Sequence, residues 1–270
     1  MPQTPSHRTL RTSEIADAVG VHANTVRLYE EWGFLPPIPR TDSGYRQYNE
    51  FHLDQMRFAR KALHGGWPGP KIRKSALALV RCAATGELAE ALVMARDHHA
   101  LVLAELDYAE TAVVYIQQWL KGGVTESITN PLSINQAAKL LKVSTDRLRD
   151  WERNGLLTTQ RNPKNNYREY GVEEIGRLRV ICALRRARFS TLAILRMLLA
   201  VEKDNTTDVR AALDTPDPED DIQYATNQWL STLEIHEQRA ANMIQILEEM
   251  VKKHGNQHLA NCDQSFTDYS

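Results

Sequence analysis

The sequence predicts a mainly α-helical fold in which one structural module occurs twice. Two observations lead to this fold class. Blocks of sequence that lie 122 residues apart share their distinctive residues, and two later stretches, 88–120 and 226–250, place apolar residues at alternating four- and three-residue steps. The first pattern indicates a tandem repeat, and the second is typical of long helices that pair through an apolar seam.

The repeat is clearest in two blocks of twelve residues. Residues 24–35 read NTVRLYEEWGFL, and residues 146–157 read DRLRDWERNGLL. The aligned pairs are Arg27 with Arg149, Tyr29 with Trp151, Glu30 with Glu152, Gly33 with Gly155, and Leu35 with Leu157. The same offset places YRQY at 45–48 over YREY at 167–170, so a single duplication accounts for both matches.

Each copy begins with two short helices separated by a tight turn, which is the helix-turn-helix pattern. The expected helices cover 12–18 and 23–32 in the first copy, and 133–141 and 145–153 in the second. Ser133 and Gln136 have the spacing of a capping box at the start of a helix. Gly33 and Gly155 follow the second helix of each copy, where a left-handed residue commonly ends a helix.

A hairpin, or wing, and a third helix are expected to follow in each copy. Gly44 and Asn166 both tolerate the positive φ that a hairpin tip requires, and each precedes the aromatic and basic strand of its copy. The third helix is expected over 50–63 and over 172–188. The repeated module is therefore predicted to be a winged helix-turn-helix domain.

The two long stretches are expected to pair with each other inside one chain. A helix over the 33 residues 88–120 would be about 50 Å long. If the two helices run antiparallel, the first one ends beside the second copy, so the short linker at 122–131 is sufficient. The sequence therefore predicts an intramolecular pseudo-dimer that is a monomer in solution.

These expectations divide the chain as follows: a first winged helix-turn-helix domain at 8–85, a first long helix at 86–121, the linker at 122–131, a second winged helix-turn-helix domain at 132–201, a second long helix at 219–254 and a flexible tail at 255–270.

Composition excludes several classes of protein. With 42% hydrophobic and 25% charged residues, the chain has the composition of a globular protein. No apolar run is long enough to cross a membrane, and residues 1–12 lack the apolar core of a secretory signal. The three cysteines are few and widely separated, which favours a reducing compartment. We expect a cytoplasmic protein without a cofactor or a membrane partner. No Ser/His/Asp grouping, phosphate loop or HExxH motif points to an enzyme.

Charge is distributed unevenly along the chain. The formal net charge is only −1, but residues 130–200 hold fourteen Lys and Arg against six Asp and Glu. Residues 201–254 hold five basic residues against twelve acidic ones. Positive charge is therefore concentrated on the second copy, as binding to phosphates requires.

The repeated residues resemble a known family. The run TVRLYEEWGFLPP followed by RTDSGYRQY is similar to the N-terminal domain of the mercury-resistance regulator (MerR) family of bacterial transcription factors. The resemblance covers residues 10–63 closely and residues 132–190 with departures. In the second copy, Trp151 stands where the first has a tyrosine, Asn166 replaces the wing glycine, and the proline pair after the block is missing. With these departures, the two copies need not read the same half-site.

The resemblance implies a regulator that binds double-stranded DNA at a pseudo-palindromic promoter site, next to RNA polymerase. It implies that the second helix of each unit enters the major groove and that the wing contacts the backbone. The residues it suggests are Asn24, Thr25, Arg27, Tyr29, Arg40, Tyr45, Arg46 and Tyr48 in the first copy, and Thr145, Arg147, Arg149, Trp151, Arg161, Tyr167, Arg168 and Tyr170 in the second.

Structural roles are the alternative for some of these residues. Tyr48, Trp151 and Tyr170 could equally be core residues. Glu30 and Glu152 are expected to be structural partners of an arginine in the same unit rather than DNA contacts.

Two further sites remain open in the sequence. A small apolar effector could lie between the long helices, near His99, Tyr108, Tyr115, Trp119, Tyr224, Trp229 and His236. Plain interface packing is the alternative reading of these residues. Cys82, His258 and Cys262 could approach one another as soft metal ligands, but a buried cysteine and a polar tail are the favoured explanation, and no metal site is predicted. The functional alternative to a regulator is a resistance protein that sequesters a drug between the long helices.

Overall fold

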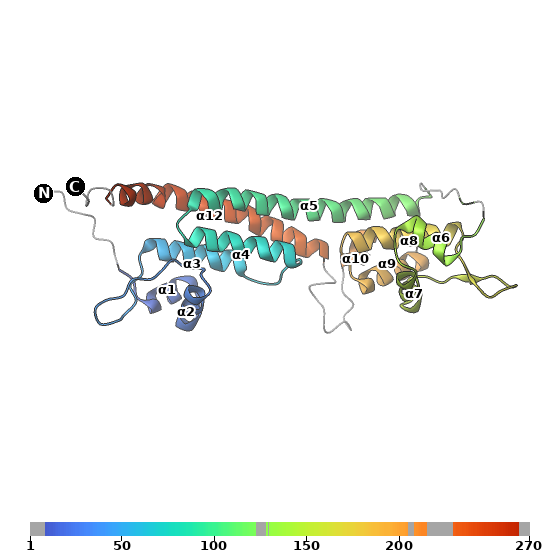
Figure 1. Ribbon diagram of the computed structural model, residues 1–270, viewed down its shortest axis with the longest axis horizontal. Helices are drawn as coiled ribbons and strands as arrows, with labels where there is room; N and C mark the ends of the chain where they lie inside the picture. Colours follow the sequence, from blue (N-terminus) through green and yellow to red (C-terminus); the bar gives the residue numbers. More distant parts are fainter. Residues whose placement is uncertain (1–8, 123–127, 129, 205–207, 215–228, 265–270) are drawn as a thin grey trace. The chain divides into compact units, whose positions relative to one another are not determined.

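A computed structural model describes residues 9–122, 128, 130–204, 208–214 and 229–264, with side chains described up to residue 255 (Figure 1). The chain forms two compact units. Unit 1 consists of Met1–Leu103 and Ile235–Ser270, and unit 2 consists of Ala104–Glu234. The described residues are mostly helical, which confirms the predicted mainly α-helical class. Among them, no helix is both long enough and apolar enough to span a lipid bilayer.

Unit 1 contains the first copy of the repeat. Its elements are α1 (Thr12–Val19), α2 (Ala23–Glu31), α3 (Glu50–Leu63), α4 (Pro70–Ala84), the first part of α5 (Leu88–Leu120) and the larger part of α12 (Trp229–Gln264). Helix α1 ends at Gly20, which adopts a left-handed φ of 66°. Asn49 caps α3 by accepting a hydrogen bond from the backbone of His52 at 3.0 Å. These local signals place the helices within a residue or two of the predicted bounds.

Unit 2 contains the second copy. Its elements are the remainder of α5, α6 (Ile134–Leu141), α7 (Thr145–Arg153), β1 (Gln160–Arg161), β2 (Arg168–Glu169), α8 (Val172–Arg186), α9 (Thr191–Lys203), α10 (Val209–Asp214) and the start of α12. Strands β1 and β2 pair antiparallel, with Gln160 opposite Glu169. In the first copy the equivalent hairpin is reduced to a single bridge between Arg40 and Arg46.

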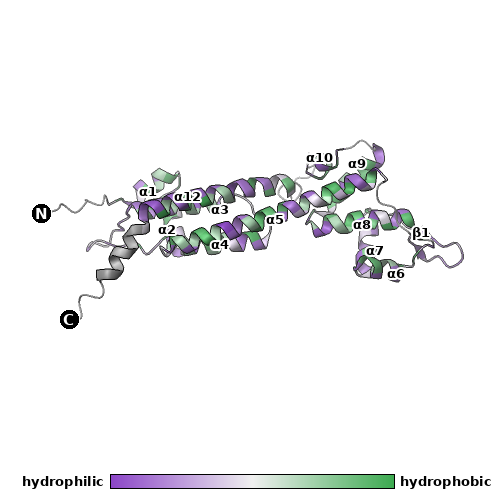
Figure 2. Cartoon of the chain, turned by 90° about the horizontal axis from the view of Figure 1, so that it is seen from above, coloured by the Kyte–Doolittle hydropathy of each residue, from purple (hydrophilic) through white to green (hydrophobic). Residues whose placement is uncertain are grey.

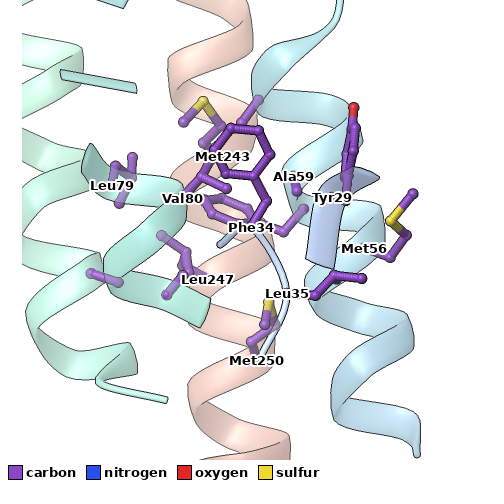
Figure 3. Close-up of a cluster of buried hydrophobic side chains, with 14 of the residues drawn as sticks. Tyr29, Phe34, Leu35, Met56, Ala59, Leu79, Val80, Met243, Leu247 and Met250 are labelled. Atoms are coloured by element: carbon purple, nitrogen blue, oxygen red, sulfur yellow. The ribbon is translucent and has the colours of Figure 1, made fainter. Parts of the chain in front are cut away.

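The second long helix supplies part of the core of unit 1. Figure 3 shows side chains of α12 in one apolar cluster with those of α3, α4 and the α2 region. The labelled residues are Met243, Leu247 and Met250 of α12, Leu79 and Val80 of α4, Met56 and Ala59 of α3, and Tyr29, Phe34 and Leu35. The three α12 side chains are at most 2% exposed, so the first copy is not fully packed without the last part of the chain.

Within unit 1 the two long helices run antiparallel. Arg96 pairs with Glu248 at 3.5 Å, and three residues further along α5 the ring of His99 lies 2.8 Å from Glu237. The residue number of the α12 partner falls as the residue number in α5 rises, so the two helices run in opposite directions. Figure 2 shows apolar and polar residues alternating along both helices, as an apolar seam with a solvated opposite face requires.

In unit 2 the end of α5 packs closely on α8. A Cβ atom at Gly176 would lie only 2.9 Å from the indole Nε1 of Trp119, so the glycine permits this approach. Arg188 pairs with Glu105 at 3.0 Å, which adds a second link to α5. Arg210 of α10 pairs with both Glu110 and Glu234, and so joins one residue of each long helix.

The second long helix differs in extent from the prediction of 219–254. Its described part begins at Trp229, because residues 215–228 lie outside the described part of the chain. It continues to Gln264, well into the segment predicted as a flexible tail. Gly255 lies inside the helix, and a single internal glycine costs only about 1 kcal/mol, which is too little to end a long helix.

Candidate nucleic-acid interface

The second helix of each helix-turn-helix is held in the same way in both copies. In α2 the backbone N–H of Asn24 donates to Nδ1 of the capping His22 at 3.2 Å. In α7 the backbone N–H of Arg147 donates to Oγ of the capping Ser144 at 3.2 Å. One face of each helix is buried, through Val26 and Tyr29 in α2 and through Leu148 and Trp151 in α7. The opposite face is thereby left to solvent.

Polar side chains cover that solvent face. Asn24 and Arg27 are exposed in α2, as are Arg147 and Arg149 in α7, while Thr25 and Thr145 are half-buried. Arg27 donates to Asn24 at 3.1 Å, and Arg149 donates to Asp146 at 2.6 Å. Exposed contacts of this kind are worth at most about 1 kcal/mol, so a phosphate or a base edge could replace them.

Four aromatic residues that were candidates for DNA contact lie in the core instead. The exposed fractions are 8% for Tyr29, 1% for Tyr48, 5% for Trp151 and 0% for Tyr170. Side chains this deeply buried offer almost no surface to a ligand. The prediction of DNA contact is therefore corrected for these four residues, and the structural alternative considered for Tyr48, Trp151 and Tyr170 describes them.

The wing tips share one geometry despite a difference in loop register. Arg40 donates to the carbonyl of Gly44 at 3.3 Å, and Arg161 donates to the carbonyl of Asn166 at 3.2 Å. Gly44 and Asn166 have φ values of 83° and 58°, as predicted for the two tips. The two arginines lie 121 residues apart rather than 122, yet each one donates to the carbonyl at the tip of its own hairpin.

The tyrosine after each tip projects into solvent. Tyr45 is 75% exposed and Tyr167 is 73% exposed, the two most exposed large apolar side chains of the described residues. An exposed ring next to a basic residue is well placed to contact a sugar or a phosphate group of DNA. The wing tips therefore remain in the candidate interface.

The second wing arginine of each copy binds the glutamate of the preceding helix. Arg46 donates through Nε to Glu30 at 2.7 Å, and Arg168 donates through Nε to Glu152 at 2.6 Å. Burial would raise the pKa of Glu152, but hydrogen bonds from Thr159 and Arg168 outweigh it, so the pKa is lowered and the carboxylate stays ionised. The glutamates are structural partners, as expected, and they anchor each wing to its α2 or α7 helix.

Sequence reasoning missed a cationic groove that occurs in both copies. In unit 1 it has a volume of about 280 Å³ and is lined by Val19, Arg57, Arg60, Lys61 and His64. In unit 2 it has a volume of about 380 Å³, and its lining includes Leu141, Arg179, Cys182, Ala183 and Arg186. Each residue of the first set lies 122 positions before its counterpart in the second. The repeat offset, applied to the third helix, would have revealed the groove.

Cations of α7 and α8 adjoin in unit 2. The pKa of Arg185 is lowered by burial and by the neighbouring charge of Arg147. Burial raises the pKa of the Cys182 thiol, and the nearby Arg186, Arg147 and Arg179 oppose that change. Residues of α7 and α8 therefore form one positive surface, to which an anionic backbone would be attracted.

The candidate effector residues are divided between the two units. His99 and His236 belong to unit 1, where they bind Glu237 and the carbonyl of Gly66. Tyr115 lines the cationic groove of unit 2, and Trp119 packs against Gly176. Tyr108 is 46% exposed and Trp229 is 7% exposed. Tyr224 lies outside the described residues.

The described side chains contain no cluster of three His, Cys, Asp or Glu residues that could hold a metal ion. Cys82 is half-buried, and burial raises the pKa of its thiol. The side chains of His258 and Cys262 lie beyond those described. No metal site is assigned.

Comparison with known families agrees with the repeat. The profile of MerR HTH family regulatory proteins matches residues 132–201, and the profile of MerR family regulatory proteins matches residues 11–48. The two matches fall on the two copies found in the sequence. No solved structure gives a significant match to the chain.

Three curated relatives are also similar. The mercuric resistance operon regulatory protein of Bacillus cereus is 36% identical over 24% of this chain and 48% of its own length. The transcriptional regulator CueR of Escherichia coli is 33% identical over 22% of this chain and 43% of its own length. A probable heavy metal-dependent transcriptional regulator of Haemophilus influenzae is 29% identical over 41% of this chain and 84% of its own length.

The chain thus spans less than half the length of the first two of these relatives. The two family profiles match residues that hold the helix-turn-helix and wing pattern described above, one profile in each half of the chain. Each half of the chain therefore carries a MerR-type unit, and the two units stand in tandem.

Proposed function

We propose that this protein is a DNA-binding transcription regulator of the MerR type, in which two winged helix-turn-helix units of one chain bind a pseudo-palindromic promoter site. One observation carries the proposal. Both copies expose the same set of groups, namely arginines of the second helix, a tyrosine at the wing tip and a cationic groove on the third helix. Both copies bury the equivalent aromatic residues.

The exposed groups fit the two tasks of a DNA-binding surface. Arg27 and Arg149 lie on the helix that would enter the major groove, where arginine reads guanine edges or binds phosphate. The groove of each copy adds cations of the third helix, which would neutralise phosphates without reading sequence. The printed names of the relatives, which describe transcriptional and operon regulators, support the same class of function.

The wing arginines provide a test of the interface. Arg46→Ala and Arg168→Ala should each weaken binding to DNA from upstream of the protein's own gene by about fivefold to tenfold. Each change should also reduce the slope of log affinity against log salt by about 1, because one phosphate contact is lost. Fluorescence anisotropy over a series of salt concentrations measures both quantities.

The matched controls are Glu30→Ala and Glu152→Ala, which remove the partner and keep the arginine. A purely structural arginine would make each glutamate variant as weak as the corresponding arginine variant, with an unchanged salt slope. Unchanged affinity in both arginine variants would remove the wing from the proposed interface.

The second part of the proposal is that one chain supplies both units. We infer that the long helices pair within the chain, because Arg96 with Glu248 and His99 with Glu237 already form such pairs in unit 1. Light scattering should therefore give the mass of a single chain, and one chain should saturate one operator. A stable mass of two chains would instead mean that the helices pair between molecules.

A further inference from the structure

Unit 1 contains a second groove, along α4, that the proposed DNA interface does not use. Its volume is about 600 Å³. Trp67, Pro70 and Leu77 provide an apolar wall, and Arg73, Lys74 and Arg81 provide three cations, with no acidic residue in the lining. The combination of an indole with several cations suits an aromatic molecule that carries a negative charge.

Contacts with α12 hold the apolar wall of this groove in place. The ring of Trp67 lies 5.6 Å from that of His236, and Nε2 of this histidine forms a hydrogen bond with the carbonyl of Gly66 at 2.7 Å. His236 itself is only 3% exposed. The Trp67 loop is thereby anchored to α12, so the wall exists before any ligand arrives.

Two of the cations have no partner within the described part of the chain. The side chains of Arg73 and Lys74 are exposed and form no hydrogen bond or ion pair there. Arg81 is oriented differently, because its Nε donates to the carbonyl of Trp32 at 3.3 Å and its guanidinium lies 5.4 Å above the Phe34 ring. Trp32 is the residue that ends α2.

The second copy has no equivalent groove lining. At the repeat offset, Trp67 corresponds to Phe189, which is fully buried, and Arg73 corresponds to Leu195. The counterpart of Lys74 is Arg196, whose Nε donates to the carbonyl of Ala212 in α10 at 3.1 Å. A surface that binds DNA would be expected in both copies. This groove belongs to the first copy alone.

We propose that the α4 groove of unit 1 binds a small aromatic anion, and that Arg81 couples its occupancy to the recognition helix α2. The aromatic body would lie against Trp67 and Pro70, and a carboxylate or sulfonate would pair with Arg73 and Lys74. An anion there also attracts Arg81 away from the carbonyl of Trp32, which loosens the end of α2. The regulatory part of this inference rests on the proposed DNA-binding function, whereas ligand binding itself does not.

Two dyes separate the charge requirement from the apolar one. Anilinonaphthalene sulfonate carries a sulfonate, and phenylnaphthylamine has a similar aromatic body without charge. Fluorescence titration of the full chain should show saturable binding of the sulfonate. In the double variant R73Q/K74Q, affinity for the sulfonate should fall about tenfold, because two ion pairs are lost, while that of the neutral dye changes by less than about twofold.

A matched control removes the same charge elsewhere. The double variant R60Q/K61Q changes the other groove and should bind the sulfonate as the wild type does. Trp67→Phe keeps an aromatic wall and should retain most binding, while Trp67→Ala should weaken both dyes. Equal loss of sulfonate binding in R73Q/K74Q and R60Q/K61Q, or none in R73Q/K74Q, would overturn the site.

Hydrogen exchange tests the coupling without DNA. Saturation with the sulfonate should speed amide exchange at the end of α2, around residues 30–34, in the wild type. Arg81→Gln should show fast exchange there with or without the dye. Bound dye with unchanged exchange at these amides would overturn the coupling through Arg81. Failure of DNA binding in the anisotropy experiment would overturn the proposed function while leaving the dye titrations unaffected.

Discussion

Replacing Tyr170 by alanine should lower the free energy of unfolding by about 3–5 kcal/mol, the range found when large buried aromatic side chains are truncated. The ring is fully buried, and the backbone of Tyr170 exchanges two hydrogen bonds with Leu132, at 2.8 and 2.9 Å. The side chain therefore fills the space where the base of the wing meets the start of the second copy. Chemical denaturation followed by circular dichroism measures the loss.

Tyr170→Phe separates the contribution of the ring from that of the hydroxyl group. The phenol oxygen is buried and has no hydrogen-bond partner among the residues that the structure describes, so its removal should leave the free energy of unfolding nearly unchanged or slightly higher. DNA affinity should also stay within about twofold, since a buried ring makes no contact with phosphate. If the phenylalanine variant folded normally but lost DNA binding, Tyr170 would have to reach DNA after all.

Acidification should destabilise unit 1 through two buried histidines. Burial, with the neighbouring His236 and His99, lowers the pKa of His98 to about 4. Burial, with the nearby Arg239, lowers the pKa of His236 to about 4 as well. Both are 3% exposed, and they hydrogen bond to the Ser75 hydroxyl and to the carbonyl of Gly66.

The sign of the effect follows from the lowered pKa. The unfolded chain takes up a proton on each histidine near pH 6.5, whereas the folded chain resists until about pH 4. Stability is therefore greatest above pH 6.5 and falls as the pH is lowered toward 4. Between pH 7 and pH 5 the two groups together should cost about 4 kcal/mol of unfolding free energy.

Neutral replacements identify the groups responsible. Asparagine at 98 can keep a hydrogen bond at the Nδ1 position, and glutamine at 236 can keep one at the Nε2 position. The double variant H98N/H236Q should lose most of the decline in stability between pH 7 and pH 5. A decline as steep as that of the wild type would assign the acid sensitivity to other groups.

Local signals predicted the helix-turn-helix units well. The predicted span 50–63 coincides with α3, and 145–153 coincides with α7, because caps and turn residues act over three or four positions. The family resemblance, by contrast, misplaced Tyr29 and Trp151 on the DNA-binding surface. Each lies three residues after a buried Val26 or Leu148, and that spacing puts it on the inner face of the helix. The resemblance of the motif was given more weight than this periodicity.

Long-range features were less accessible from sequence. The sequence predicted that Glu30 pairs with an arginine of its own unit, as it does with Arg46, because the two residue types recur together in both copies. The α4 groove was not, since it requires Gly66 and Trp67 to meet His236, which lies about 170 positions later in the chain. No local pattern reports a contact over that separation, and the second copy provides no equivalent to suggest it.

The contribution of α12 to the core of the first copy has a consequence for biosynthesis. Met243, Leu247 and Met250 are synthesised more than 160 residues after Val80, yet they fill space beside Phe34 and Val80. The nascent first copy must therefore keep an apolar surface open to water until α12 has been made. Truncated products that end after α5 should be recognised by chaperones or degraded, so that an isolated half of the protein would rarely accumulate in a cell.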